Sequence, residues 1–147
     1  MSTTWRPDDS FLDKEQGELK GVRRVMDALE KHGVRPRGGV LTSQDRGVEA
    51  TRDDLRRTHM PAGFRQFQLP VVLGPDKNVL GFMTEGEPNS EIPEHSHGVE
   101  LFRVVISGSV LYGDQELKAG DWMSVEAGSP YGFKSGDEGC IIFHMYW

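Results

Sequence analysis

Two histidines separated by a single residue, His95 and His97, have the residue types and the spacing best suited to chemistry in this sequence. An apolar run at 101–106 follows them and ends at Ser107 and Gly108, so the pair stands at the edge of a predicted strand. Side chains two residues apart in a strand project to the same face, so both imidazoles can bind one metal ion. The spacing therefore predicts a metal site, with a carboxylate as a further ligand.

Glu100 is the candidate carboxylate, and its orientation depends on the register of the strand that follows. If one extra residue bulges the strand before Gly108, Glu100 faces inward as a metal ligand and Arg103 faces solvent. We expect this register, because burying an unpaired guanidinium is costly. Without the bulge, Leu101 and Arg103 point inward, and Arg103 would bind the carboxylate of a substrate through two hydrogen bonds.

Two segments resemble the motifs of the cupin superfamily. The first cupin motif is G-x5-H-x-H-x3,4-E-x6-G; His95 and His97 occupy its histidine positions, and Gly108 its closing glycine. The second motif is G-x5-P-x-G-x2-H-x3-N, and the segment beginning at Gly120 is similar to it, with Gly128 at its second glycine. The resemblance identifies the C-terminal part of the chain as a small cupin with a degenerate metal motif.

The departures from these motifs affect the metal ligands most. Tyr131 stands where the second motif has the third metal-binding histidine, and counting back from the closing glycine puts Leu101 at the glutamate position. Asn89, Glu126 and Ser135 replace the opening glycine, the proline and the asparagine. The resemblance implies four ligands, of which two histidines remain in this reading.

His144 could replace the missing third histidine. In the barrel that the resemblance implies, the last strand lies antiparallel to the strand after Glu100. One face of that last strand carries Cys140, Ile142, His144 and Tyr146, and the other carries Ile141, Phe143, Met145 and Trp147. The second face is more apolar and is expected to face the core, which would turn His144 outward. The alternative is a metal site of His95, His97 and His144, with or without Glu100.

Tyr131 is the predicted catalytic residue. A neutral phenol with a pKa near 10 is a poor metal ligand unless the metal deprotonates it. We therefore expect its hydroxyl to donate a proton or a hydrogen bond to a bound substrate. Phe82 and Phe133 would line the substrate pocket together with Arg103, or they would fill the core.

The resemblance implies one divalent transition metal ion, iron, zinc, nickel or manganese (Fe, Zn, Ni or Mn). It favours a metal-dependent enzyme of the oxygenase, cyclase or isomerase type that acts on a small organic molecule. Open coordination positions beside two or three protein ligands would accept substrate and water. The alternative is a cupin that binds or senses a small molecule without catalysis, which the loss of two standard ligands favours.

Composition and charge restrict the classes of partner and the cellular compartment that we expect. With a formal net charge of −6 over 147 residues, the chain has no general electrostatic attraction to nucleic acid or to anionic membranes. No apolar run approaches the roughly 20 residues of a spanning helix. The one cysteine, Cys140, has no partner for an internal disulfide. We expect a soluble, cytoplasmic protein.

Residues 1–63 are expected to form an N-terminal extension with two helices, followed by the barrel at 64–147. Asp13 can cap the first helix and Gly33 can end it, and Thr51 can cap the second. The first helix has an apolar face, formed by Leu19, Val22, Met26 and Leu29. Because this face needs an apolar surface to cover, we expect the extension to pack on the barrel or on a second subunit, in a homodimer.

Short strands separated by turn residues predict an all-β fold after residue 64. The expected strands are 64–73, 79–85, 100–106, 109–112, 115–117, 122–126, 131–134 and 140–147, with one more at 39–43 in the extension. Gly113 and Asp114 are typical of a tight hairpin turn. The resemblance implies that these strands form a double-stranded β-helix, the cupin jelly-roll barrel.

Overall fold

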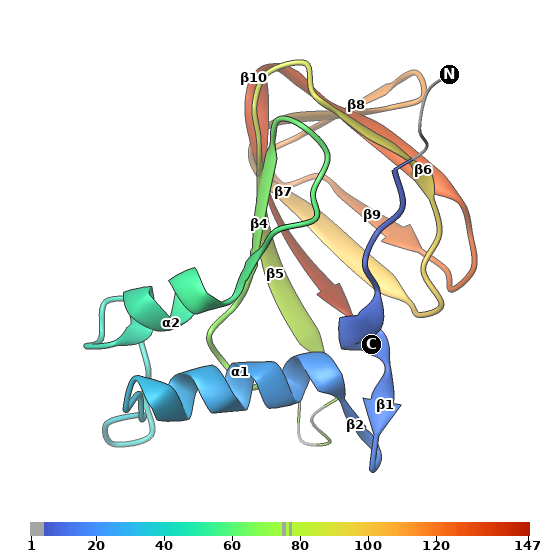
Figure 1. Ribbon diagram of the computed structural model, residues 1–147. Coiled ribbons are helices and arrows are strands. Elements are labelled where there is room, and N and C mark those ends of the chain that lie inside the picture. Colours follow the sequence, from blue (N-terminus) through green and yellow to red (C-terminus); the bar gives the residue numbers. More distant parts are fainter. Residues whose placement is uncertain (1–4, 75, 77) are drawn as a thin grey trace.

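The computed structural model describes residues 5–74, 76 and 78–147. An antiparallel sheet has the strand order β3-β4-β5-β10-β7-β8, with β6 also beside β10 and β9 also beside β7. Its strands are β3 (Arg56–Arg57), β4 (Phe64–Gln68), β5 (Leu80–Gly86), β6 (Glu91–His95), β7 (Leu101–Tyr112), β8 (Gln115–Lys118), β9 (Trp122–Val125) and β10 (Tyr131–Tyr146). The sheet curls around one core, as the predicted jelly roll requires (Figure 1).

Two long strands replace two predicted pairs of shorter ones. β10 pairs with β6 near its start, with β5 near its end, and with β7 along its other edge, so it links the parts of the barrel. β7 continues through Gly108, whose φ of +69° suits glycine. A Cβ at Gly108 would collide with the carbonyl of Gly139 on the facing strand. The closing glycine of the first motif therefore allows β7 and β10 to pass closely.

β6 was not among the predicted strands, although it ends at His95. Asn89, just before it, has a φ of +58°. This left-handed conformation favours glycine, and asparagine is the usual substitute. Asn89 thus performs the backbone role of the motif's opening glycine. The predicted hairpin turn at Gly113 and Asp114 is confirmed, since it connects β7 to β8.

The extension contains η1 (Ser10–Leu12), the hairpin of β1 (Lys14–Glu15) and β2 (Glu18–Leu19), and the helices α1 (Lys20–Lys31) and α2 (Val48–Asp54). Both predicted helix starts were wrong. Asp13 precedes the β1–β2 hairpin, which delays α1 to Lys20. Thr51 lies inside α2, where its hydroxyl donates to the carbonyl of Gly47. The predicted strand at 39–43 is only a single bridge between Arg37 and Val40.

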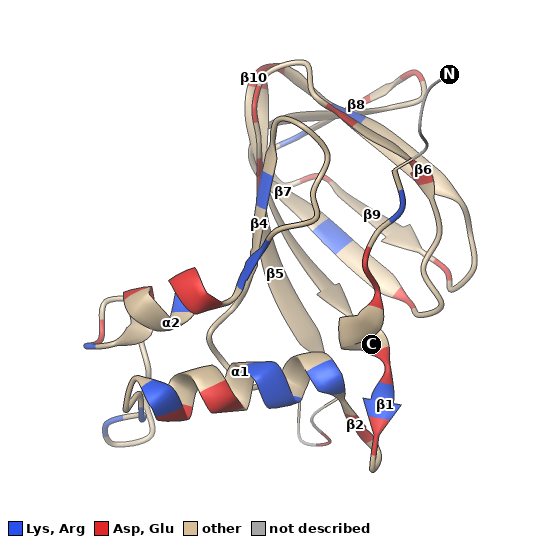
Figure 2. Cartoon of the chain, viewed as in Figure 1, with Lys and Arg blue, Asp and Glu red and all other residues tan. Residues whose placement is uncertain are grey.

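Helix α1 buries its apolar face against its own barrel. Val22 and Val25 are buried, and a Cβ at Gly21 would lie 2.7 Å from the Leu80 side chain. Gln68 of β4 donates to the carbonyl of Gly21, at 3.2 Å, which fixes the helix to the sheet. Basic and acidic positions both occur along α1 (Figure 2). None of the helices in the described part of the chain is long and apolar enough to cross a membrane.

In the C-terminal half of β10, the face that points to the core is not the face that we predicted. Ile142, His144 and Tyr146 are buried, whereas Phe143 and Met145 are half-buried on the outer side. The prediction was wrong because it assumed that the more apolar face must be the inner one. The outer side of this sheet is itself apolar, with a cross-strand row formed by Phe67, Met83, Phe143, Val104 and Trp122.

Candidate functional site

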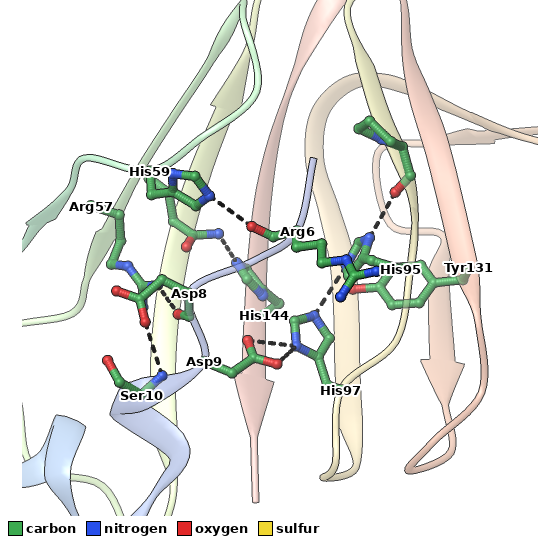
Figure 3. A network of polar contacts seen from close by, with 12 residues as sticks. Arg6, Asp8, Asp9, Ser10, Arg57, His59, His95, His97, Tyr131 and His144 are labelled. Carbon is green, nitrogen blue, oxygen red and sulfur yellow. Dashed lines mark hydrogen bonds and ion pairs between the residues drawn. The ribbon is translucent and has the colours of Figure 1, made fainter. Parts of the chain in front are cut away.

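A cavity inside the barrel contains most of the predicted site residues. Its lining includes His95, His97, Arg103, Tyr131 and Phe133. The segment at residues 5–9 crosses in front of these side chains, as Figure 3 shows for Arg6, Asp8 and Asp9. The remaining free volume is about 30 Å³, which is room for about two water molecules.

His95 and His97 point toward each other, with their Nε2 atoms 3.1 Å apart. The Nδ1 of His95 donates to the carbonyl of Pro93 at 2.8 Å, so its proton is on Nδ1 and its Nε2 lone pair faces His97. Burial, together with the nearby Arg103 and His97, lowers the pKa of His95 to about 4. His95 is therefore neutral at pH 7, as a metal ligand must be.

His97 is held by a residue that the sequence reading did not identify. Its Nδ1 lies 3.0 and 3.1 Å from the two carboxylate oxygens of Asp9. A carboxylate there favours the tautomer with the proton on Nδ1, which leaves Nε2 as an acceptor directed toward His95. Asp9 is 88 positions away in the sequence, and no local pattern links it to the histidines. Only the path of the N-terminal segment brings the two together.

This pair fits two positions of a metal ion. Two bonds of about 2.0–2.1 Å from adjacent ligand positions place their nitrogens roughly 3 Å apart, close to the observed 3.1 Å. Without a metal, the 3.1 Å contact is a hydrogen bond in which one Nε2 carries a hydrogen and the other accepts it; with a metal, both lone pairs would bind the ion. Each ring has the partner on its other nitrogen that metal-binding histidines usually have. Among the described residues, however, there is no group of three or more His, Cys, Asp or Glu side chains that could hold a metal.

Glu100 does not join the histidines, and the predicted register of β7 was wrong. Leu101 and Arg103 face inward and are buried, while Glu100 lines a separate surface pocket with Trp147. The predicted bulge before Gly108 does occur, at Ile106, where pairing with β10 skips one residue. It does not turn Glu100 inward, because Leu101, Arg103 and Val105 form the buried face. The predicted outward orientation of Arg103 is therefore corrected.

Arg103 lies in the barrel with only 5% of its surface exposed. One Nη donates to the Tyr131 hydroxyl at 3.1 Å, and the guanidinium carbon lies 4.7 Å from the centre of the Phe133 ring. Its Nε has no hydrogen-bond partner. Within the described ranges, no carboxylate forms an ion pair with it. The expected energetic cost is thus met in part by aromatic faces and one hydroxyl.

His144 is fully buried, but it is engaged elsewhere in the barrel. Its Nε2 lies 3.0 Å from the Thr84 hydroxyl and 3.2 Å from the Gln66 amide nitrogen. Burial, and then the positive charge of Arg103, lower its pKa well below the usual value. The Tyr146 ring contacts the rings of both His144 and His97. His144 therefore belongs to a neighbouring polar cluster.

The aromatic residues predicted for the site divide into two groups. Tyr131 lies against the His95 ring, with centroids 4.5 Å apart, and burial raises the pKa of its hydroxyl. Phe133 lines the same cavity beside Arg103. Phe82 instead packs in the core against Phe11, with centroids 5.2 Å apart. Tyr131 and Phe133 are thus close to the histidine pair, whereas Phe82 supports the cavity from the core.

The N-terminal segment is fastened across the cavity by several contacts. The Trp5 ring lies edge-on to His95 at 5.2 Å and stacks on His59 at 6.2 Å. The His59 Nε2 is 2.7 Å from the Arg6 carbonyl, and Arg57 donates to the Asp8 carbonyl. The segment therefore encloses the histidine pair and supplies Asp9 to it.

Comparison with known proteins identifies the fold. A chain of the crystal structure of Rhodobacter sphaeroides SigE in complex with the anti-sigma ChrR has a TM-score of 0.54 and 18% identity, over 63% of this chain and 48% of that chain. The polyketide cyclase RemF from Streptomyces resistomycificus has a TM-score of 0.51 and 23% identity, over 65% and 75%. An RmlC-like cupin from Shewanella frigidimarina has a TM-score of 0.50 and 17% identity, over 63% and 92%.

These likenesses confirm the predicted cupin jelly-roll fold, and the helices α1 and α2 are consistent with the predicted N-terminal extension. This chain spans about half the length of the SigE–ChrR chain, at 48%. No family model and no curated protein sequence matches it. At such identities the solved structures show the fold alone, since the cupin barrel hosts many unrelated activities.

Proposed function

We propose that the protein is a metal-dependent cupin enzyme that acts on a small organic molecule, with His95 and His97 holding one divalent transition metal ion. The observation that carries the proposal is the convergence of the two Nε2 atoms at 3.1 Å, with each Nδ1 engaged by an acceptor. Such an ion, iron, zinc, nickel or manganese, would polarise a substrate oxygen or a bound water.

Tyr131 is the proposed proton or hydrogen-bond donor in this site. Its hydroxyl accepts a hydrogen bond from Arg103, so its own hydrogen can be donated to a substrate atom. Burial raises its pKa, which keeps the hydroxyl protonated at neutral pH. A fixed donor beside the reacting group stabilises negative charge that develops during the reaction.

Elemental analysis of protein purified without an affinity tag tests the metal. We expect about one transition metal ion per chain, and its loss in His95→Ala and in His97→Ala. His32→Ala is the matched control, because His32 lies on the extension and pairs with Asp54, away from the cavity. Metal-free wild-type protein, or metal retained by both site variants, would refute the proposal.

The second candidate is a cupin that binds a small molecule without catalysis. It is favoured by the lack of a third metal-binding side chain near the pair among the described residues. The metal analysis separates the candidates, because the second predicts ligand binding by metal-free protein. Tyr131→Phe adds a second comparison. In the enzyme it should keep the metal and lower turnover, whereas in a binding protein it should lower only ligand affinity.

A further inference from the structure

We propose that the molecule bound in the cavity carries a carboxylate, and that Arg103 is the residue that binds it. This inference rests on the proposed function for the location of the site and adds the class of substrate. The observation behind it is a guanidinium that is 5% exposed, lines the cavity of the two histidines and has no ion-pair partner in the described ranges.

The hydrogen-bonding groups of Arg103 are only partly used. One Nη donates to Tyr131, while the buried Nε has no partner. Arginine cannot lose its charge in a protein, so a buried guanidinium requires an anion for full compensation. Its planar fork binds a carboxylate through two parallel hydrogen bonds. The stacking of the guanidinium on Phe133 holds that fork in one orientation.

Two aspartates also reach the cavity, and neither compensates Arg103. The Asp9 carboxylate is bound to His97, at 3.0 and 3.1 Å. Asp8 accepts from the backbone amide of Ser10. Hydrogen bonding from the side chain and then the backbone of Ser10, and the nearby Arg57, lower the pKa of Asp8. While they keep these contacts, neither aspartate offers its carboxylate to Arg103.

The few hydrogen-bond donors around Arg103 favour a carboxylate over phosphate. About 30 Å³ is free while the segment is in place, enough for an ion of the size of formate. One arginine and one hydroxyl also provide few donors for a phosphate dianion. A larger carboxylate must displace part of the segment ahead of Asp9, where Trp5 and Pro7 line the cavity, and its carboxylate would then lie at Arg103 with the rest of the molecule toward the histidines.

Titration of the metal-free protein with formate, acetate and benzoate tests this inference, with formamide, acetamide and benzamide as uncharged controls. Nitrogen-15 NMR of the Arg103 Nε–H, and the midpoint of thermal unfolding, report binding. We expect a saturable shift of that signal and a higher midpoint with at least one carboxylate, and neither with the amides. Phosphate is titrated in the same way, as the alternative anion to a carboxylate.

Three variants make the result specific to Arg103. Arg103→Met should abolish carboxylate binding without lowering the unfolding midpoint, since it also removes a buried uncompensated charge. Arg103→Lys should weaken binding about tenfold or more, because it keeps a charge without the fork. Arg65→Met, which removes an exposed guanidinium that pairs with Glu85, should bind as wild type does.

Each failure has a distinct meaning. If Arg103→Met still binds carboxylates, if amides bind equally well, or if only phosphate binds, the inference is overturned, and the metal analysis of His95 and His97 still decides the proposed function. If Arg103-dependent carboxylate binding is found in a protein that never holds metal, the enzyme proposal fails and the substrate class remains correct.

Discussion

The polar side chains inside the barrel form two neighbouring clusters. One cluster joins His95, His97 and Asp9, and the other joins His144 to Thr84 and Gln66. Each histidine has at least one defined partner, so the ring orientations are fixed in the absence of a ligand. We interpret the His144 cluster as a structural one that stabilises the barrel. The effect of protonating His144 on the free energy of unfolding tests this interpretation.

We predict that His144 makes the protein less stable as the pH falls below about 6.5. Its pKa lies well below the usual value in the folded state, because of burial and then of Arg103. The unfolded chain therefore binds more protons in this range, and the free energy of unfolding decreases with falling pH. The slope from one histidine approaches about 1.4 kcal/mol per pH unit.

Urea unfolding at several pH values between 7.5 and 5 measures this slope, in a range where carboxyl groups titrate little. His144→Gln should show a smaller slope than wild type over the same range. Some dependence will remain, because the pKa of His95 is lowered to about 4 and acts in the same direction. Identical slopes for the two proteins would show that His144 is not titrated during unfolding.

The sequence identified the histidine pair, Tyr131 and Arg103 as residues of interest, because strand alternation and motif spacing are local properties. It did not identify Asp9, whose contact with His97 is created by tertiary structure alone. It also misjudged the direction of Arg103. The general cost of a buried charge was outweighed here by contacts with Tyr131 and Phe133 of β10, which pairs with β7 in space but begins 28 residues after Arg103 in the sequence.

At the scale of elements, the N-terminal segment determines access to the site. Trp5 and Asp9 lie on the histidines, and Phe11 anchors the segment in the core. The contacts before Phe11 are mostly single hydrogen bonds and ring contacts at the edge of the barrel. We therefore expect residues 5–9 to open locally without unfolding the barrel.

We predict that Trp5→Ala loosens this segment and speeds the entry of benzoate. The substitution removes the ring contacts with His59 and His95. Hydrogen–deuterium exchange of the N-terminal peptide should increase, while exchange in β10 stays unchanged. Trp147→Ala is the matched control, because Trp147 is 49% exposed and lines a different pocket. Equal exchange in both variants would mean that Trp5 does not fasten the segment.

Sequence patterns located the barrel strands better than their inner faces. The strand positions follow from turn residues such as Gly113 and Gly128, and most of them were confirmed. The inner face of β10 was wrong because alternation shows which residues share a face, but does not show which face is covered. The rule that the more apolar face is buried does not apply to a sheet that is apolar on both sides.

At the scale of the whole molecule, the outer apolar row extends across five strands. It runs through β4, β5, β10, β7 and β9, and its members are Phe67, Met83, Phe143, Val104 and Trp122. Trp122 is 61% exposed, and Ile106 beside the row is 50% exposed. These five residues are uncharged, and the guanidinium of Arg52 lies over the Phe67 ring at one end of the row, at 5.1 Å. A contiguous apolar surface of this kind is typical of an interface between proteins.

The homodimer therefore stays a prediction, but we now expect its interface at the outer row. Helix α1 covers its apolar face with its own barrel, so the outer row is the surface that a second copy would cover. A two-fold axis through the row places apolar side chains against apolar side chains, which an isologous interface requires. We expect the wild type to have twice the chain mass of 16.5 kDa in light scattering at micromolar concentration.

Val104→Lys tests that location, because it places a charge at the centre of the row. It should give a monomer of 16.5 kDa with an intact circular dichroism spectrum. Val40→Lys is the matched control, since Val40 is 62% exposed on a loop of the extension and should leave the dimer unchanged. A wild-type monomer would contradict the dimer, and a dimeric Val104→Lys would move its interface elsewhere. Since the row lies on the outer side of the sheet, opposite the cavity, neither variant should change carboxylate binding.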